Sequence, residues 1–141
     1  MNRMRWAAAV LAASVFGPAA GAQQPDASAP ARQAAEAWLA VVDSGRYADS
    51  WAQAAEAFRG AVSQAAWDST TRVHRTPLGA VTSRELLGAQ PMTNPPGAPP
   101  GEYVLLQFRT RFAGRELPAV ETVVPMKEKD GPWRVSGYFI R

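Results

Sequence analysis

Residues 117–140 read LPAVETVVPMKEKDGPWRVSGYFI, and they contain the clearest strand and turn signals of the chain. Valine-rich segments at 117–127 and 133–140 flank Asp130 and Gly131, and an Asp-Gly pair between two such segments is a strong signal for a tight β-hairpin. A third segment of the same kind, at 103–112, reads YVLLQFRTRF. We therefore predict three consecutive antiparallel strands in the C-terminal part of the chain.

The lengths of the two turns predict how these strands pair. A two-residue turn in the second hairpin places Val124 opposite Gly137, and a three-residue turn at 113–115 places Phe108 opposite Val120. Both registers put the same apolar side chains on one face of the sheet, which we predict to be the core: Val104, Leu106, Phe108, Phe112, Val120, Val124, Met126, Trp133, Val135 and Phe139.

The opposite face is predicted to carry charges at its ends, Glu121 among them, and an apolar patch in its middle. That patch consists of Tyr103, Leu105, Val123, Pro125, Tyr138 and Ile140. A sheet with one solvent-exposed face should not carry so compact an apolar patch on that face. We expect it to be covered either by a second copy of the chain, in a homodimer, or by the proline-rich segment 89–101.

The segment between residues 31 and 75 repeats apolar residues at three- and four-residue spacing, which predicts helices at 31–43, 47–59 and 61–75. A further strand is predicted at 80–87. Residues 89–101 contain five prolines and two glycines and are predicted to form a long surface loop. Helices in the front half and strands in the back half indicate a single α+β domain, 31–141, with three N-terminal helices packed on a four-stranded antiparallel sheet.

The N-terminal segment has the layout of a secretory signal peptide. Arg3 and Arg5 precede an apolar run at 6–16, and small residues at 20–22 suit cleavage before Gln23. A membrane span needs about 20 apolar residues, so this run is too short to be one. We therefore predict a signal peptide at 1–22, a flexible leader at 23–30, a periplasmic or secreted protein, and no stable membrane insertion.

Charge and composition exclude several classes of function. Removing the two arginines of the signal peptide lowers the basic count from 15 to 13, against 12 acidic residues. A nearly neutral domain lacks the excess positive charge that nucleic-acid binding requires. The chain has no cysteine and a single histidine, so we expect no disulfide, no metal site and no cofactor.

Residues spread over nearly the whole predicted domain resemble a bacterial family of small exported proteins, domain-of-unknown-function family 4019. The matching positions are Trp38, Val41-Val42-Asp43, Gly45-x-Tyr47-x-x-Ser50-Trp51, Phe58, Trp67, Arg75-x-Pro77-Leu78-Gly79, Arg84, Gly101-x-Tyr103, Phe108-x-Thr110-x-Phe112 and Asp130-Gly131-x-Trp133-Arg134-Val135-x-Gly137-Tyr138. The element order is also similar to the cystatin-like cone of nuclear transport factor two and ketosteroid isomerase. That resemblance implies a curved sheet with a cavity between the sheet and the helices, and it implies no established activity.

Candidate site residues fall into three groups. Asp43, Tyr47 and His74 are the candidate acid-base residues, although each also suits an ordinary structural position. Arg75 and Arg84 could hold an anion or form ion pairs with Glu85, Glu116 or Glu121. The candidate ligand pocket, which could equally be plain core packing, is aromatic and consists of Trp38, Trp51, Phe58, Trp67, Phe108 and Trp133.

We predict a non-enzymatic module of the cell envelope that binds a small apolar ligand or an envelope protein. The first alternative is an isomerase- or dehydratase-like enzyme of the same cone fold. The second alternative is a purely structural envelope protein, in which the outward apolar patch is the functional surface.

Overall fold

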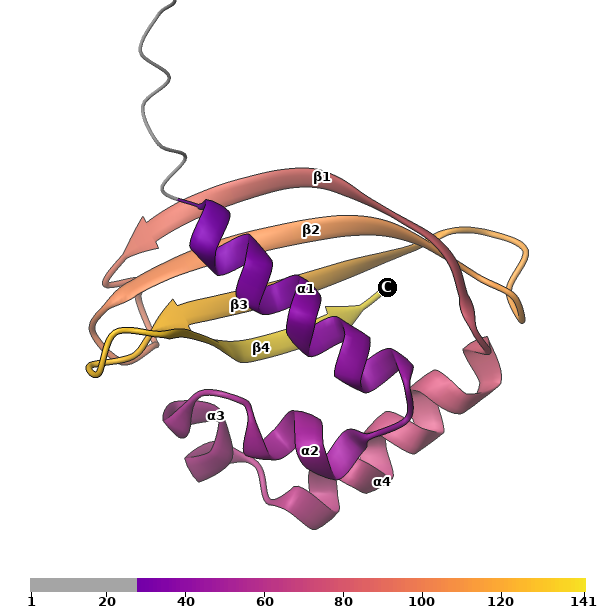
Figure 1. Cartoon of the computed structure of the whole chain (residues 1–141), viewed down its shortest axis with the longest axis horizontal. Coiled ribbons are helices and arrows are strands. Elements are labelled where there is room, and N and C mark those ends of the chain that lie inside the picture. The colour runs from indigo at the N-terminus through magenta and orange to yellow at the C-terminus, as the bar shows by residue number, and fades with distance from the viewer. Residues whose placement is uncertain (1–27) are drawn as a thin grey trace, which may run out of the picture.

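The computed structural model of the chain describes residues 28–141. The described part contains four α-helices, a 3-10 turn and one sheet of four antiparallel strands, which confirms the α+β class (Figure 1). The elements are α1 (Ala29–Asp43), α2 (Tyr47–Ala52), α3 (Glu56–Ala61), α4 (Gln64–Arg75), η1 (Thr76–Leu78), β1 (Val81–Thr93), β2 (Glu102–Phe112), β3 (Ala119–Lys127) and β4 (Trp133–Ile140). The predicted signal peptide, 1–22, lies outside the described residues, as does most of the predicted leader.

The prediction of three helices was wrong, because the expected helix 47–59 is two short helices, α2 and α3. Between them, Ala54 and Ala55 are fully buried. The amide of Ala55 donates a hydrogen bond to the carbonyl oxygen of Val135 in β4, with an N–O distance of 2.8 Å. An amide bonded to a strand cannot also bond along a helix, so a contact that is distant in sequence ends the helical repeat.

The strands follow one another in the order β1-β2-β3-β4. β1 is longer than predicted and runs into the proline-rich segment, where Pro91 pairs with Val104 of β2. Proline lacks a backbone donor and is tolerated in an edge strand, which is the position of β1. The loop predicted at 89–101 is therefore confined to residues 94–101.

The predicted pairing of β2 with β3 was wrong by one residue. Phe108 lies opposite Glu121, and Val120 lies opposite Arg109. The connection at 113–118 is longer than a tight turn because it is held by η1: Gly114 donates its amide to Leu78 O at 2.8 Å. A Cβ added at Gly114 would lie 2.6 Å from Pro77 O, so glycine permits this approach.

In the second hairpin the predicted pair Val124 and Gly137 is confirmed, but the predicted two-residue turn is wrong: the amide of Glu128 donates to Pro132 O at 2.9 Å, which leaves a three-residue loop at 129–131. A bulge follows Val124, so that the next residue of β3, Pro125, lies opposite Val135. A bulge re-aims the side chains on either side of it. It contributes to the difference between the faces that were predicted and those that are observed.

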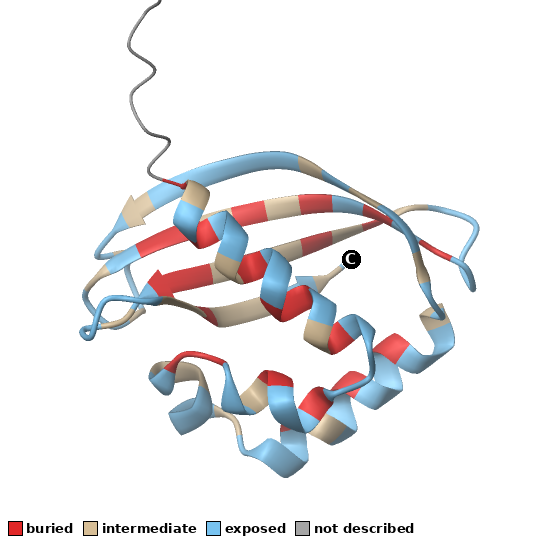
Figure 2. Ribbon diagram, viewed as in Figure 1, coloured by how far each residue is buried: buried red, intermediate tan, exposed pale blue. Residues whose placement is uncertain are grey.

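These shifts change which residues form the core. The even-numbered residues of β2 from Val104 to Phe112 are buried as predicted, and Val135 is buried as well. On β3 the core-facing residues are Glu121, Val123 and Pro125, whereas Val120 and Val124 lie on the other face. Phe139 is likewise outside the core and is 62% exposed. Figure 2 shows the buried side of β2 and β3 beneath α1.

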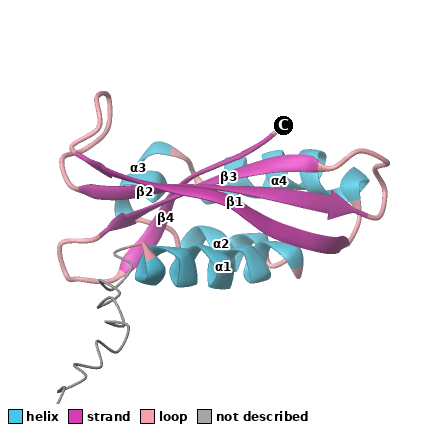
Figure 3. Cartoon of the chain, turned by 90° about the horizontal axis from the view of Figure 1, so that it is seen from above, coloured by secondary structure: helices cyan, strands magenta, loops and turns pink. Residues whose placement is uncertain are grey.

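α1 lies across one face of the sheet, over β3 and β4, while α2, α3 and α4 lie along the β4 edge (Figures 1 and 3). The buried stripe of α1 is spaced as an amphipathic helix requires, with Ala31, Ala35, Trp38, Leu39 and Val42 facing the sheet. None of the helices between residues 28 and 141 is long and apolar enough to cross a membrane.

The core under α1 predicts the stability effect of a single truncation. Leu39 is 0% exposed, so Leu39→Ala should lower the free energy of unfolding by about 2–5 kcal/mol through lost burial and the cavity it leaves. Leu117 is 71% exposed, and Leu117→Ala should change it by less than about 0.5 kcal/mol. Urea unfolding of the two variants measures both values. Similar losses in the two would contradict this placement of the core.

Candidate functional site

A network of six polar side chains lies where the helices meet the sheet. It draws one residue from the end of α1, one from the end of α4 and one from each strand. The members are Asp43 (α1), Arg75 (α4), Arg84 (β1), Thr110 (β2), Glu121 (β3) and Tyr138 (β4). The polar network therefore joins every strand of the sheet to two of the helices through side chains.

Glu121 is the centre of this polar network, and its side chain is 0% exposed. Arg84 donates a hydrogen bond from Nε to Glu121 Oε1 at 2.8 Å, and its Nη2 lies 2.8 Å from the same oxygen as an ion pair. Thr110 donates its hydroxyl to the same oxygen, and Tyr138 donates its hydroxyl to Oε2. A carboxylate is tolerated in a protein interior only when its oxygens are satisfied in this way.

Asp43, the last residue of α1, is the second carboxylate of the polar network. Arg84 binds both of its oxygens, with Nη1 2.7 Å from Oδ2 and Nη2 3.1 Å from Oδ1. Arg75 adds a third hydrogen bond, from Nη2 to Oδ1 at 2.7 Å. Two-point contacts between a guanidinium and a carboxylate are the strongest ion-pair geometry in proteins. Asp43 is thereby fixed on the two arginines.

Arg75 connects the two carboxylates. Its Nη1 donates to Tyr138 OH at 3.1 Å and lies 3.9 Å from Glu121 Oε2. Its guanidinium also lies over the ring of Phe112, 5.1 Å from the ring centroid. The formal charges of the two arginines and two carboxylates cancel, so the polar network is electrically balanced.

The polar network shifts the pKa values of its members. Burial alone would raise the pKa of Asp43, but hydrogen bonds from Arg84 and Arg75 outweigh it and lower that pKa. Burial raises the pKa of the Tyr138 phenol far above its usual range, and the neighbouring Glu121 adds to the rise. Asp43 is therefore a weak base near neutral pH, and Tyr138 keeps its proton.

Removing charge from the centre of the polar network should destabilise the fold strongly. Glu121→Gln leaves the buried Arg75 and the partly buried Arg84 with a single carboxylate, so we expect the free energy of unfolding to fall by about 3–5 kcal/mol. Glu85→Gln is the matched control, because Glu85 is exposed and lies 3.8 Å from Arg109. It should cost less than about 0.5 kcal/mol. Equal losses in urea unfolding would show that Glu121 is not held as described.

The lowered pKa of Asp43 predicts a loss of stability in acid. A carboxyl whose folded pKa lies below its ordinary value of 3.8 stabilises the fold at every pH above that value, and the stabilisation is lost as the pH falls through the folded pKa. Asp43→Asn should be less stable at neutral pH, and its stability should fall less steeply below about pH 4.

Urea unfolding across this pH range measures the slope. Asp49→Asn is the control, since that carboxyl is exposed and lies 3.0 Å from Arg46, and it should keep the slope of the wild type. If Asp43→Asn also kept it, the two arginines would not be protecting Asp43 from protonation.

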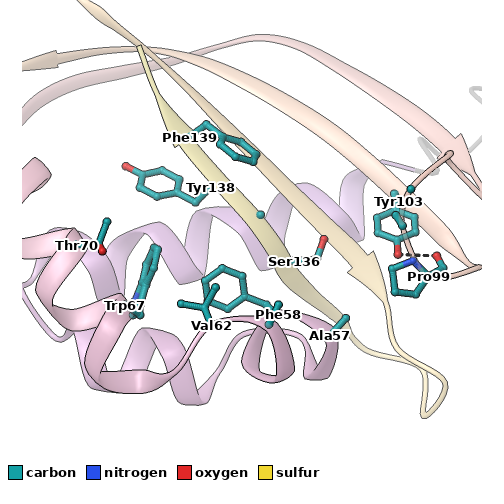
Figure 4. A pocket seen from close by; sticks show the side chains of 14 residues that line it. Ala57, Phe58, Val62, Trp67, Thr70, Pro99, Tyr103, Ser136, Tyr138 and Phe139 are labelled. Atoms are coloured by element: carbon teal, nitrogen blue, oxygen red, sulfur yellow. Dashed lines mark hydrogen bonds between the residues drawn. The ribbon is translucent and has the colours of Figure 1, made fainter.

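An apolar groove of about 670 Å³ runs between β4 and the helices α3 and α4 (Figure 4). Phe58, Val62 and Trp67 come from the helical side, and Tyr138 and Phe139 come from β4. The groove is completed by Ala57, Ala61, Thr70, Gly97, Ala98, Pro99, Tyr103, Ser136 and Gly137. Its volume lies in the range of small-ligand sites, and its wall is mainly aromatic and aliphatic.

Four of the five polar side chains in the wall of the groove are hydrogen-bonded within the protein, and the fifth is Thr70. Trp67 Nε1 donates to Ser50 Oγ at 2.9 Å, and Tyr103 OH donates to Pro99 O at 2.7 Å. Ser136 Oγ donates to Val124 O at 2.7 Å, while Tyr138 OH belongs to the polar network. The groove therefore favours an occupant that is bound by shape and apolar contact.

The predicted aromatic pocket is only partly assembled as a pocket. Phe58 and Trp67 line the groove, with ring centroids 5.2 Å apart. Trp38 and Phe108 are buried in the core, and Trp51 and Trp133 pack against that core. Most of the predicted set is thus core packing.

Two of the three candidate acid-base residues, Asp43 and Tyr47, line one cavity of about 350 Å³, which Arg75 also lines, whereas His74 does not line it. Asp43 lies in the polar network, and the ring of Tyr47 lies 5.3 Å from the guanidinium of Arg72. His74 lines a separate cavity of about 260 Å³ between α4 and β4, which Arg75 and Tyr138 also line.

The residues of the predicted dimer face are divided between the two faces. Val123, Pro125 and Tyr138 lie on the core side, because the register differs from the predicted one. Tyr103 is buried and hydrogen-bonded to Pro99 of the proline-rich loop. Leu105 lines a shallow depression on the outer face, and Ile140 lines both this depression and the cavity beside α4.

The polar network was only partly foreseen. The alternative that pairs Arg75 and Arg84 with Glu121 is confirmed, whereas Glu121 was expected on the solvent-exposed face. Thr110 and Tyr138 were missed as polar contacts because both fit an apolar alternation. Tyr138 was placed on the wrong face with its strand neighbours.

This geometry defines a class of protein: an α+β domain whose sheet and helices are joined by a buried ion-pair network, with an apolar groove along one edge of the sheet. None of the described residues lining that groove carries a carboxylate, a guanidinium or an ammonium group.

The chain belongs to the family described as "Protein of unknown function (DUF4019)", whose sequence model matches residues 34–138. The family resemblance of the sequence is therefore confirmed. Comparisons with curated proteins and with solved structures found no match.

Proposed function

We propose that this protein is a non-enzymatic binding module of the cell envelope and that its site is the apolar groove between β4 and the helices α3 and α4. The observation that carries the proposal is the combination of an uncharged aromatic wall with polar groups that are already hydrogen-bonded inside the protein. Such a wall recognises an uncharged, apolar occupant.

The groove is also held in shape before any occupant arrives. The indole of Trp51 donates to Val62 O at 2.7 Å, which ties α2 to the segment between α3 and α4. The indole of Trp38 donates to Ser50 O at 2.8 Å, which ties α1 to α2. A preformed wall lowers the entropic cost of binding.

Export to the envelope is part of the same proposal. It rests on the basic start, the apolar run and the small residues of 1–22, together with cleavage before Gln23. The cone resemblance is also a proposal, which is supported by one helix lying across a curved antiparallel sheet (Figure 1).

A different observation bears on each of the two alternative functions. An isomerase- or dehydratase-like enzyme would need an acid or base with a tuned pKa, and the lowered pKa of Asp43 makes that residue a weak base near neutral pH. A purely structural protein or a homodimer would use the outer face, where Leu105, Val124 and the exposed Phe139 line a depression of about 510 Å³.

The proposal predicts that the groove takes up an apolar dye. The uncharged dye N-phenylnaphthylamine should become fluorescent on titration with the purified protein. Ala61→Trp, in the wall of the groove, should weaken binding by roughly tenfold, equivalent to about 1.4 kcal/mol. Ala65→Trp adds the same ring at an exposed position of α4 outside the groove and should leave the affinity unchanged. Unaltered binding in Ala61→Trp would overturn the assignment of the groove.

A further inference from the structure

We propose that the occupant of the groove is an extended polypeptide segment, which adds to the sheet as an extra strand along β4 and places apolar side chains in the groove. The inference rests on the proposed function and names the class of partner. It is carried by the backbone of β4, whose outer edge is the floor of the groove.

β4 is the last strand in the order of the sheet, and its pairing partner among the described residues is β3. Residues 136–139 of this strand line the large groove, and residues 138–140 line the smaller cavity beside α4. Both spaces share Trp67, Thr70, Tyr138 and Phe139, so they follow the strand edge one after the other.

The register shows which backbone groups face this edge. Arg141 exchanges both of its backbone hydrogen bonds with Val120 of β3, at 2.9 and 3.0 Å. Hydrogen-bonded and non-hydrogen-bonded pairs alternate along an antiparallel ladder, so the amides and carbonyls of Tyr138 and Ile140 point away from β3. These groups are the donors and acceptors that an added strand requires.

One backbone hydrogen bond from another segment of the chain is already made at this edge of β4. Ala55, which has the extended dihedral angles φ −60° and ψ 148°, donates its amide to Val135 O at 2.8 Å. The chain then turns away into α3 and leaves the edge beyond it unpaired by any backbone bond outside the β3–β4 ladder, within residues 28–141. A peptide at Tyr138 and Ile140 would therefore continue an existing line of backbone pairing.

Strand addition also explains the position of the apolar wall. Side chains of an added strand alternate between its two faces. One set would face Trp67 and the cavity of about 260 Å³ beside α4, and the other set would lie next to the exposed ring of Phe139. The uncharged lining of the groove favours uncharged, apolar side chains in the partner.

The test compares two peptides on the unmodified protein. The first is a short acetylated and amidated peptide of alternating valine and threonine. The second is the same peptide with its central amides N-methylated, which removes backbone donors and keeps the side chains. Calorimetric titration should show binding of the first peptide, and binding of the second should be weaker by roughly tenfold for each hydrogen bond that the methyl groups remove. Equal affinities, or no binding of either, would overturn the proposal.

A pair of variants tests the edge from the side of the protein. Ile140→Pro removes an outward-facing amide without removing a bond to β3, and should weaken binding of the first peptide by roughly tenfold. Ile140→Ala keeps the amide and should lower the affinity by less. Thermal unfolding checks that both variants fold. If only Ile140→Ala lost affinity, the side chain rather than the backbone would bind the peptide.

The two proposals fail in different ways. If the dye binds in the groove and the two peptides do not differ, the groove is a binding site and strand addition is wrong. If Ala61→Trp leaves dye binding unaltered, the assignment of the groove itself is wrong. If the protein is a dimer that Ile140→Pro dissociates, a second copy occupies the edge and the peptide proposal is overturned.

Discussion

The rest of the structure depends on the burial of one carboxylate, that of Glu121. Withdrawing a carboxylate from water costs several kcal/mol unless its oxygens are satisfied, and here they are satisfied by Arg84, Thr110 and Tyr138 from the other three strands. A slip of β3 by one residue would turn Glu121 outward and leave Arg84 facing an apolar side chain. We infer that this polar network selects one register among those that the apolar pattern allows.

Much of the fold follows from local sequence. The strands at β2, β3 and β4, the hairpin at Asp130 and Gly131, and the stripe of α1 are set by alternation, turn chemistry and helical spacing, which act over a few residues. The pairing of β2 with β3 could not be predicted in this way. The length of its connection is fixed by the contact of Gly114 with η1, and that contact joins residues far apart in the sequence.

The candidate site was less predictable than the fold for the same reason. Phe58 follows from its helical spacing and Trp67 was singled out as an aromatic residue, but the groove that they line lies beside the point where the amide of Ala55 bonds to β4 and divides the expected helix. Glu121 was misplaced because an acid in a strand is ordinarily exposed. Arg75 and Arg84 were the available signal for the polar network, since two cations near one turn favour carboxylates close to them.

The two edge strands of the sheet, β1 and β4, differ in their capacity to pair with a strand of another chain. β1 carries Pro91, which cannot donate a backbone hydrogen bond, whereas β4 has no proline between Trp133 and Ile140. Proline at an edge opposes end-to-end stacking of sheets. A chain that bound a strand at β4 would therefore not bind a further strand at β1. Growth into a fibre would stop after one addition.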